Sequence, residues 1–202
     1  MKVVELPISV ALARAVPVLP DGLGWWYEPK FDGHRMIMVR TEDTVTLYAR
    51  SGRVVTPYWM DLALVGMALR PGTVLDGEAV IWRDGRLDFG AAQSRAASSV
   101  PRARALAARY PASYACWDLV QHPDPAIGDT RPLPYTTRRA LLLELLAEVG
   151  PPIQPVPATD DRDRSRILVR GTPGAGPGRS GGQAGRGRVP VRGPWVAEGP
   201  PR

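Results

Sequence analysis

The sequence predicts an α+β domain in which mostly antiparallel β-sheets are flanked by helices. Short apolar runs at 36–40 and 44–48, joined by a polar turn, have the pattern of a strand meander. Longer strand-like runs follow at 74–82 and 112–120. Segments with helical spacing of apolar residues separate these runs and continue after them, so helices and strands are interspersed along the chain.

The N-terminal segment is expected to lead irregularly into the sheet. Within residues 1–22, Pro17, Pro20 and the Asp21-Gly22 turn precede an aromatic, strand-like run at 23–27. Gly33 is expected to be the tight point between that run and the strand that starts at Met36.

The expected strand at 74–82 contains a pair of carboxylates. Residues 58–70 precede it and have the spacing of a short amphipathic helix. Asp76 and Glu78 flank Gly77 inside an otherwise apolar run, and a buried strand does not tolerate an unpaired carboxylate. Two interpretations are open: a hairpin turn at Asp76-Gly77, or a continuous strand from which Glu78 projects into a site.

The second half of the chain is expected to contain a hairpin turn, an Ala- and Arg-rich helix, a strand, an amphipathic helix and a last short strand. In chain order they occupy 83–86, 96–109, 112–120, 131–149 and 153–156. Arg138 and Arg139 lie in the first turn of the last helix. Cys116 lies inside an apolar run and is expected to be buried in the core.

Composition limits the classes of protein to which the chain can belong. It has 202 residues, 44% of them hydrophobic, so one domain with an ordinary core is expected. The net charge of +6 suits a polyanionic partner such as nucleic acid, although much of the basic excess lies in the last part of the chain. A single cysteine excludes an internal disulfide and a thiolate metal cluster. Because no long apolar stretch and no signal-peptide pattern is present, we expect a cytoplasmic protein without a membrane segment.

The most informative stretch is 28–35, with the sequence Glu-Pro-Lys-Phe-Asp-Gly-His-Arg. It lies between two strand-like runs and places an aspartate, a glycine and an arginine close to Lys30. A lone lysine is usually a solvated surface charge. Lysine becomes a nucleophile when desolvation or neighbouring cations remove the proton from its amine. The aromatic and charged neighbours of Lys30 therefore make it a candidate nucleophile.

This stretch resembles the nucleotidyl-transfer signature (lysine, any residue, aspartate, glycine, any residue, arginine) of ATP-dependent DNA ligases, RNA ligases and messenger-RNA capping enzymes. Further elements of the ligase pattern follow in order. They are Arg50-x-Gly52, Asp76-Gly77-Glu78, the segment from Asp88-Phe89 to Gln93-x-Arg95, and Trp117-Asp118-Leu119. Ala49 stands where the pattern has serine, and Trp117 where it has phenylalanine. Over about residues 17–156 the chain is similar to the adenylation domain of bacterial ATP-dependent DNA ligases.

The resemblance implies a nucleotidyltransferase core, related to the ATP-grasp-like ligases, that uses ATP and Mg²⁺ and acts as a monomer. Lys30 would attack the α-phosphate of ATP and form a lysyl-AMP. AMP would then pass to the 5′-phosphate of nicked double-stranded DNA, in repair or recombination. The implied nucleotide-binding residues are Glu28, Asp32, Gly33, Arg35, Arg50, Glu78 and Trp117.

These implied residues have different roles. Glu28 would lie on the adenine side, Glu78 at the ribose or the metal, and Trp117 against the base. Arg35 and Arg50 would hold ribose and phosphate oxygens, and Asp32 would orient the lysine turn or the ribose. From the residues alone, Trp117 is equally well explained as a buried core side chain.

The resemblance ends before the C-terminus. The ligase pattern continues with a Glu-Gly…Lys strand and a Lys-x-Lys strand that holds the phosphates, and neither motif occurs here. We expect a partial adenylation domain at 1–165 and an irregular tail at 166–202, with no OB-fold domain. The tail is rich in Gly, Arg and Pro, a composition that buries too little apolar surface to fold. Weak or no ligation is therefore expected from the chain as written.

Two explanations of the tail are open. It resembles RGG-type nucleic-acid-binding segments, although Trp195 is its sole aromatic residue. Alternatively, it is translated out of frame. If each codon starts one base later, Gln183-Ala184 must become lysine or arginine. The shifted codons are compatible with both missing motifs in order, and the DNA sequence of codons 160–202 decides between the explanations.

Other functions are also compatible with these motifs. A related RNA ligase or capping enzyme would share the lysine signature, although the segment at 88–95 favours DNA. A non-catalytic nucleic-acid-binding protein would depend on the basic tail. A fragment without a stable fold is the remaining alternative.

Overall fold

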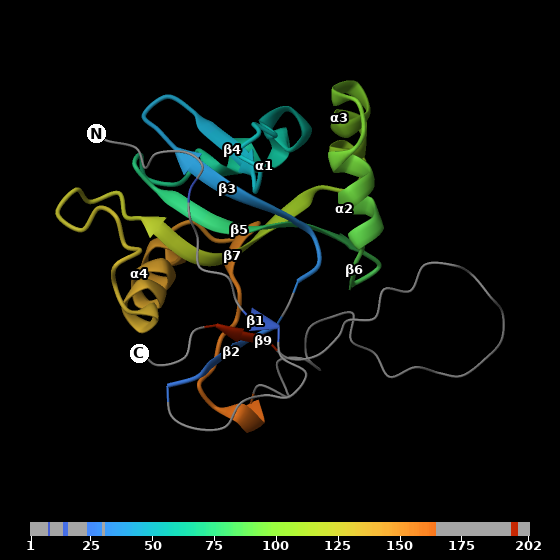
Figure 1. Cartoon of the computed structure of the whole chain (residues 1–202). Coiled ribbons are helices and arrows are strands. Elements are labelled where there is room, and N and C mark those ends of the chain that lie inside the picture. The colour runs from blue at the N-terminus through green and yellow to red at the C-terminus, as the bar shows by residue number, and fades with distance from the viewer. Residues whose placement is uncertain (1–7, 9–13, 16–23, 30, 165–194, 198–202) are drawn as a thin grey trace, which may run out of the picture. The chain divides into compact units, whose positions relative to one another are not determined.

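The computed structural model describes residues 8, 14–15, 24–29, 31–164 and 195–197, which belong to two compact units (Figure 1). The first unit comprises Met1–Ala11 and Phe31–Val156, and the second comprises Leu12–Lys30 and Pro157–Arg202. Within the described ranges, every helix is too short or too polar to cross a membrane.

A mostly antiparallel sheet forms the first unit. Its strands lie in the order β4, β3, β5, β7, β8, and the hairpin strand β6 pairs with β5. Neighbouring strands are antiparallel except β7 and β8, which are parallel. The strands are β3 (His34–Arg40), β4 (Val45–Ala49), β5 (Val74–Arg83), β6 (Arg86–Leu87), β7 (Ala112–Gln121) and β8 (Ile153–Pro155). The predicted α+β class is confirmed.

Helices bury one face of this sheet. They are the 3-10 turn η1 (Thr56–Tyr58) and the helices α1 (Met60–Gly66), α2 (Phe89–Ala96), α3 (Val100–Arg109) and α4 (Tyr135–Ala147). Strand alternation turns Met36, Met38 and Leu75 toward this face. There they pack with Leu62 of α1 and Leu142 of α4 in the largest buried cluster. The side chains at the alternate positions of these strands lie on the opposite face of the sheet.

The second unit contains a three-stranded sheet. Its central strand is β9 (Trp195–Ala197), which is antiparallel to both β1 (Arg14–Ala15) and β2 (Trp26–Glu28). Tyr27 and Thr159 exchange two backbone hydrogen bonds of 2.7 and 3.0 Å. Residues 195–197, within the tail expected to be irregular at 166–202, form β9 because they pair with β1 and β2, which are distant in sequence. The rest of that tail lies outside the described residues.

The observed elements differ from the expected ones mainly at helix ends. Each strand expected in the first unit is found, and its ends differ from the expected ends by about two residues or fewer. The expected helix at 58–70 is shorter, because it divides into η1 and α1. The helix expected at 96–109 starts at residue 100, and α2 before it was not expected.

Gly77 allows β5 to pass through the carboxylate pair as a continuous strand. Gly77 pairs with Cys116 of β7, so the alternative of a hairpin turn at Asp76-Gly77 is wrong. A Cβ atom at position 77 would lie 2.7 Å from two carbons of the Tyr114 ring and 2.6 Å from the carbonyl oxygen of Ala115. The absence of a side chain is therefore a packing requirement at this position.

We predict opposite effects for two glycine-to-alanine substitutions. Gly77→Ala forces the added methyl against Tyr114 and should lower the free energy of unfolding by about 2 kcal/mol or more. Gly90→Ala, in the exposed first turn of α2, places the added methyl 3.4 Å from its nearest neighbour, Oδ1 of Asp88. It should raise the free energy of unfolding by about 0.5 kcal/mol. Urea denaturation measures both, and equal effects of the two substitutions would contradict the close packing at Gly77.

Candidate active site

A row of charged side chains crosses the sheet face opposite the main core. In the β3–β5 register, Arg35 pairs with Glu78 and Ile37 pairs with Asp76. Paired residues and residues two apart share a face, so Arg35, Asp76 and Glu78 lie on the same side of the sheet. An apolar cluster lies on either side of this row. One is Ile37, Val39, Val74 and Val120, and the other is Phe31, Val80, Ala115 and Val156.

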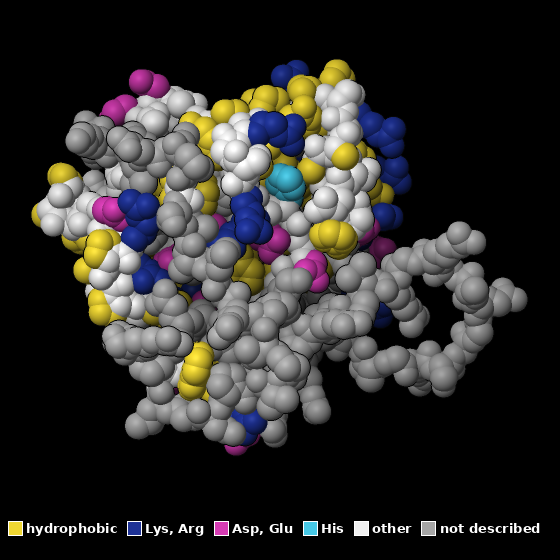
Figure 2. Space-filling view, viewed as in Figure 1, with side chains coloured by type: hydrophobic (Ala, Val, Ile, Leu, Met, Phe, Trp, Pro, Cys, Tyr) yellow, Lys and Arg dark blue, Asp and Glu magenta, His cyan; other side chains and the backbone are white. Residues whose placement is uncertain are grey.

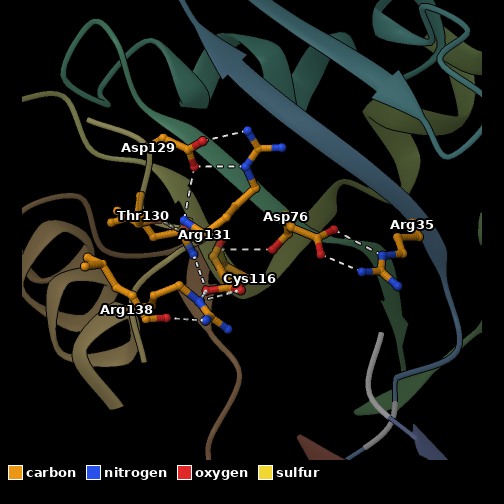
Figure 3. A network of polar contacts seen from close by, with 10 residues as sticks. Arg35, Asp76, Cys116, Asp129, Thr130, Arg131 and Arg138 are labelled. Carbon is orange, nitrogen blue, oxygen red and sulfur yellow. Dashed lines mark hydrogen bonds and ion pairs between the residues drawn. The ribbon is translucent and has the colours of Figure 1, made fainter. Parts of the chain in front are cut away.

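Arg35 and Asp76 form a buried, two-point ion pair (Figure 3). Arg35 donates from Nη2 to Oδ2 at 2.5 Å and from Nε to Oδ1 at 3.1 Å. The Asp76 side chain is 2% exposed, whereas Arg35 is 27% exposed. Burial raises the pKa of Asp76, and the hydrogen bonds from Arg35 act in the opposite direction. Asp76 is therefore fixed by its partner, while part of the Arg35 guanidinium faces solvent.

A second ion pair holds the neighbouring strand. Nε of Arg138, in the first turn of α4, lies 3.0 Å from both carboxylate oxygens of Asp118 on β7 (Figure 3). Arg138 also donates from Nη1 to the carbonyl oxygen of Leu133 at 2.8 Å. Asp118 in turn accepts a hydrogen bond of 2.9 Å from the backbone N–H of Leu119. These contacts fasten α4 to the strand beside Asp76.

Trp117 lies in a β-bulge between these two ion pairs. Asp118 pairs with Asp76 and Cys116 pairs with Gly77, so residue 117 is the extra residue of β7. Its ring meets that of Phe31 edge-on, with centroids 5.8 Å apart and ring planes at 62°. Trp117 is only partly buried. Its ring therefore has both a packed edge and solvent-accessible surface.

Gly33, the glycine of the lysine signature, packs directly against β5. A Cβ atom at Gly33 would lie 3.0 Å from Cγ of Glu78 and 3.0 Å from Cγ1 of Val80. Gln93 of α2 donates a hydrogen bond of 3.1 Å to the carbonyl oxygen of Gly33. The close approach explains why glycine is needed here and brings the segment 31–35 next to Glu78.

The remaining predicted site residues are placed as follows. Arg50 is exposed in the turn after β4, one residue beyond the last β3–β4 pair, Met36–Ala49. Asp32 is partly exposed next to Gly33. Glu28 belongs to the second unit, where it is buried in β2, and Lys30 lies outside the described residues.

The sequence interpretation missed the pairing of the buried charges. Asp76, Asp118 and Arg138 stand in motifs that were recognised, but none of them was assigned to the site. Their signal is a charged residue inside an apolar run, which requires a partner. The sequence does not say that Asp76 pairs with Arg35, or Asp118 with a helix twenty residues further on.

Arg95, in the segment that resembles the ligase pattern, has a structural role. Its side chain is fully buried, forms an ion pair with Asp61 of α1, and donates 2.8 Å to the carbonyl oxygen of Tyr58. Asp61 also accepts a hydrogen bond of 3.0 Å from the N–H of Ala112. Arg95 therefore ties α2 to α1 and η1, on the core side of the sheet.

Comparison with known proteins identifies the family. Residues 14–167 match the ATP dependent DNA ligase domain. The chain belongs to this family. It is 35% identical over 173 residues to DNA ligase C2 of Mycolicibacterium smegmatis, an alignment that covers 84% of this chain and 47% of the relative. It is 36% identical over 177 residues to DNA ligase C of Mycobacterium tuberculosis, covering 84% of this chain and 48% of that ligase.

A solved structure shares the fold. A mycobacterial DNA ligase D complexed with ATP and MES superposes with a TM-score of 0.56 and 24% sequence identity, covering 73% of this chain and 44% of that one. The chain spans about half the length of the curated relatives that it matches. The resemblance to ATP-dependent DNA ligases inferred from the motifs is confirmed.

Loss of Arg138 should destabilise the first unit far more than loss of a surface arginine. Arg138→Met leaves the Asp118 carboxylate, which is 17% exposed, without its cation and should cost about 3 kcal/mol. Arg131→Met removes the partner of Asp129 in a pair whose side chains are 38% and 41% exposed. That change should cost less than about 1 kcal/mol. Equal shifts of the urea midpoint for the two variants would contradict the anchoring role of Arg138.

Proposed function

We propose that this chain is the nucleotide-binding part of an ATP-dependent DNA ligase and transfers AMP from ATP to Lys30. The observation that carries the proposal is the charged row on the sheet face opposite the main core, with Gly33 packed on the Glu78 strand. The second step would transfer AMP to the 5′-phosphate at a nick. In the third, the 3′-hydroxyl would displace AMP and seal the strand.

Lysine composition supports Lys30 as the nucleophile. Of the 26 basic side chains in the sequence, only Lys2 and Lys30 are lysines. Arginine cannot serve, because its guanidinium does not lose its proton at physiological pH. The neutral amine of Lys30 would attack the α-phosphorus, the bond to the bridging oxygen would break, and pyrophosphate would leave. In the proposed site, the cationic groups of Arg35 and Arg50 would favour the neutral amine by raising the local positive potential.

The described face of the first unit offers partners for the parts of ATP. Arg35 lies in β3 and Arg50 in the turn that follows β4, and both would bind ribose or phosphate oxygens. Glu78, opposite Arg35 in the register, would accept hydrogen bonds from the ribose hydroxyls. The Trp117 ring would stack on adenine, as every base presents a π-face. Asp32 would orient the segment around the lysine.

Mg²⁺ fits this site as a partner of the triphosphate. In the portion of the chain that the structure describes, no three His, Cys, Asp or Glu side chains form a metal cluster. Mg²⁺ in phosphoryl-transfer sites needs only one or two carboxylates, because phosphates and waters complete its shell. Glu78, opposite Arg35 in the β3–β5 register, is the carboxylate that we propose to hold the ion. When bound, Mg²⁺ would neutralise charge on the phosphates.

The proposal includes a division of the chain. We assign residues 1–165 to the adenylation domain and 166–202 to a segment of different composition, for which an out-of-frame origin remains our hypothesis. Since the aligned relatives are about twice as long, we expect nick sealing by this chain alone to be weak compared with its adenylation.

Adenylation is testable directly. Incubation with ATP labelled at the α-phosphate, followed by a denaturing gel, should label the protein in a magnesium-dependent reaction. Lys30→Met should abolish the label, because the nucleophile is lost. Lys2→Met is the matched control and should retain it. Labelling that persists in Lys30→Met and disappears in Lys2→Met would refute the assignment.

The role of Trp117 is tested by the concentration dependence of adenylation on ATP. Trp117→Ala should raise the ATP concentration for half-maximal labelling about tenfold, since stacking on a base contributes about 1–3 kcal/mol. Trp117→Phe keeps an aromatic face and should stay close to the parent protein. If Trp117→Ala leaves the ATP dependence unchanged and only lowers thermal stability, Trp117 is a core residue, as the alternative interpretation holds.

A further inference from the structure

Helix α3 carries three arginines and no carboxylate. Between Asp88 and Asp118 the sequence contains four arginines and no aspartate or glutamate. Arg95 is the buried partner of Asp61, but Arg102, Arg104 and Arg109 are exposed on α3. None of these three belongs to an ion pair found among the described residues. Figure 2 shows Lys and Arg side chains along the edge where Figure 1 places α3 and α2.

The helix dipole gives no reason for the charge of Arg102. This residue lies in the first turn of α3, where the dipole disfavours a cation, whereas Arg109 lies in the last turn, where a cation is favoured. No glutamate or aspartate is present at a helical spacing that would form a pair with any of the three arginines. The stability of α3 therefore does not explain the charge at position 102, and a polyanionic partner does.

Helical geometry places two of the arginines on one surface. Arg102 and Arg109 are seven residues apart and share a face, whereas Arg104 points to the other side of the buried stripe. Seven residues rise by about 10 Å, which corresponds to about three phosphates along one strand of B-DNA.

A cation–aromatic stack extends this surface onto the sheet. The guanidinium carbon of Arg109 lies 5.1 Å from the ring centroid of Tyr110, and that of Arg83 on β5 lies 4.7 Å from the same centroid. Arg83 is partly neutralised by Asp88 at 2.9 Å. Both guanidinium groups therefore stack on the partly buried ring of Tyr110, which restricts their orientation.

We infer that the surface formed by Arg83, Arg102, Arg109 and Tyr110 binds the phosphate backbone of duplex DNA. The inference rests on the proposed function for its choice of partner. α2 connects this surface to the candidate active site, because Gln93 of α2 binds Gly33 and α3 packs against α2. A duplex held at α3 is thereby bound by the same unit as the nucleotide-binding face.

The test is the salt dependence of DNA binding by the whole chain. Fluorescence anisotropy of a labelled, nicked duplex is measured between about 50 and 200 mM KCl. The double variant Arg102→Gln/Arg109→Gln should bind about tenfold more weakly at the upper salt concentration. Its slope of log K against log salt should fall by about two, one for each lost phosphate contact. The charge-preserving variant Arg102→Lys/Arg109→Lys should restore the slope.

Arg104→Gln is the matched control, because it removes the same charge from the other side of the same helix. It should leave the slope close to that of the parent protein. If the double variant does not fold, by circular dichroism, the single variant Arg102→Gln should reduce the slope by about one. An unchanged slope in a folded variant, an equal loss in Arg104→Gln, or a loss confined to an RNA duplex would each overturn the inference.

The experiments test the two proposals separately. Absence of labelling by ATP in the parent protein would contradict the proposed function, and the salt dependence of DNA binding by the variants would still test the α3 surface. Absence of duplex binding by an adenylated parent protein overturns the surface alone.

Discussion

The ion pair between Arg35 and Asp76 is the constraint on which the site depends. A carboxylate that is 2% exposed in the middle of a sheet is stable only with a fixed cation, and removing one partner of such a pair costs several kcal/mol. The pair also fixes the β3–β5 register, because a slip of one residue would turn Arg35 to the opposite face. With the register fixed, Gly33, Arg35 and Glu78 are held together at the end of β3.

The two faces of the sheet have different roles. One face is buried under α1, α2 and α4, and Arg95 ties α2 to α1. The other face carries charges between two apolar clusters, and the bulge at Trp117 disturbs its regular alternation. A nucleotide requires both kinds of surface, because its base is apolar and flat while its phosphates are charged.

Local patterns in the sequence predicted most strands but few of the decisive contacts. Alternation identified β3, β4, β5 and β7, because each is a short apolar run between turn residues. The continuity of β5 was undecided, since the ring of Tyr114 that requires glycine at position 77 is distant in sequence. The helix α2, the strand β9 and the Asp118–Arg138 pair were not predicted, because each depends on a distant partner. The residue roles came from a family resemblance and remain proposals.

The central claim is that ATP binds to the charged face of the first unit, and the structure of the chain determined with bound ATP tests it most directly. The account predicts phosphate or ribose oxygens within hydrogen-bonding distance of Arg35 and Glu78, with the adenine ring against Trp117. A nucleotide on the opposite face, among α1, α2 and α4, or one that leaves Arg35 and Glu78 without contact, would contradict it.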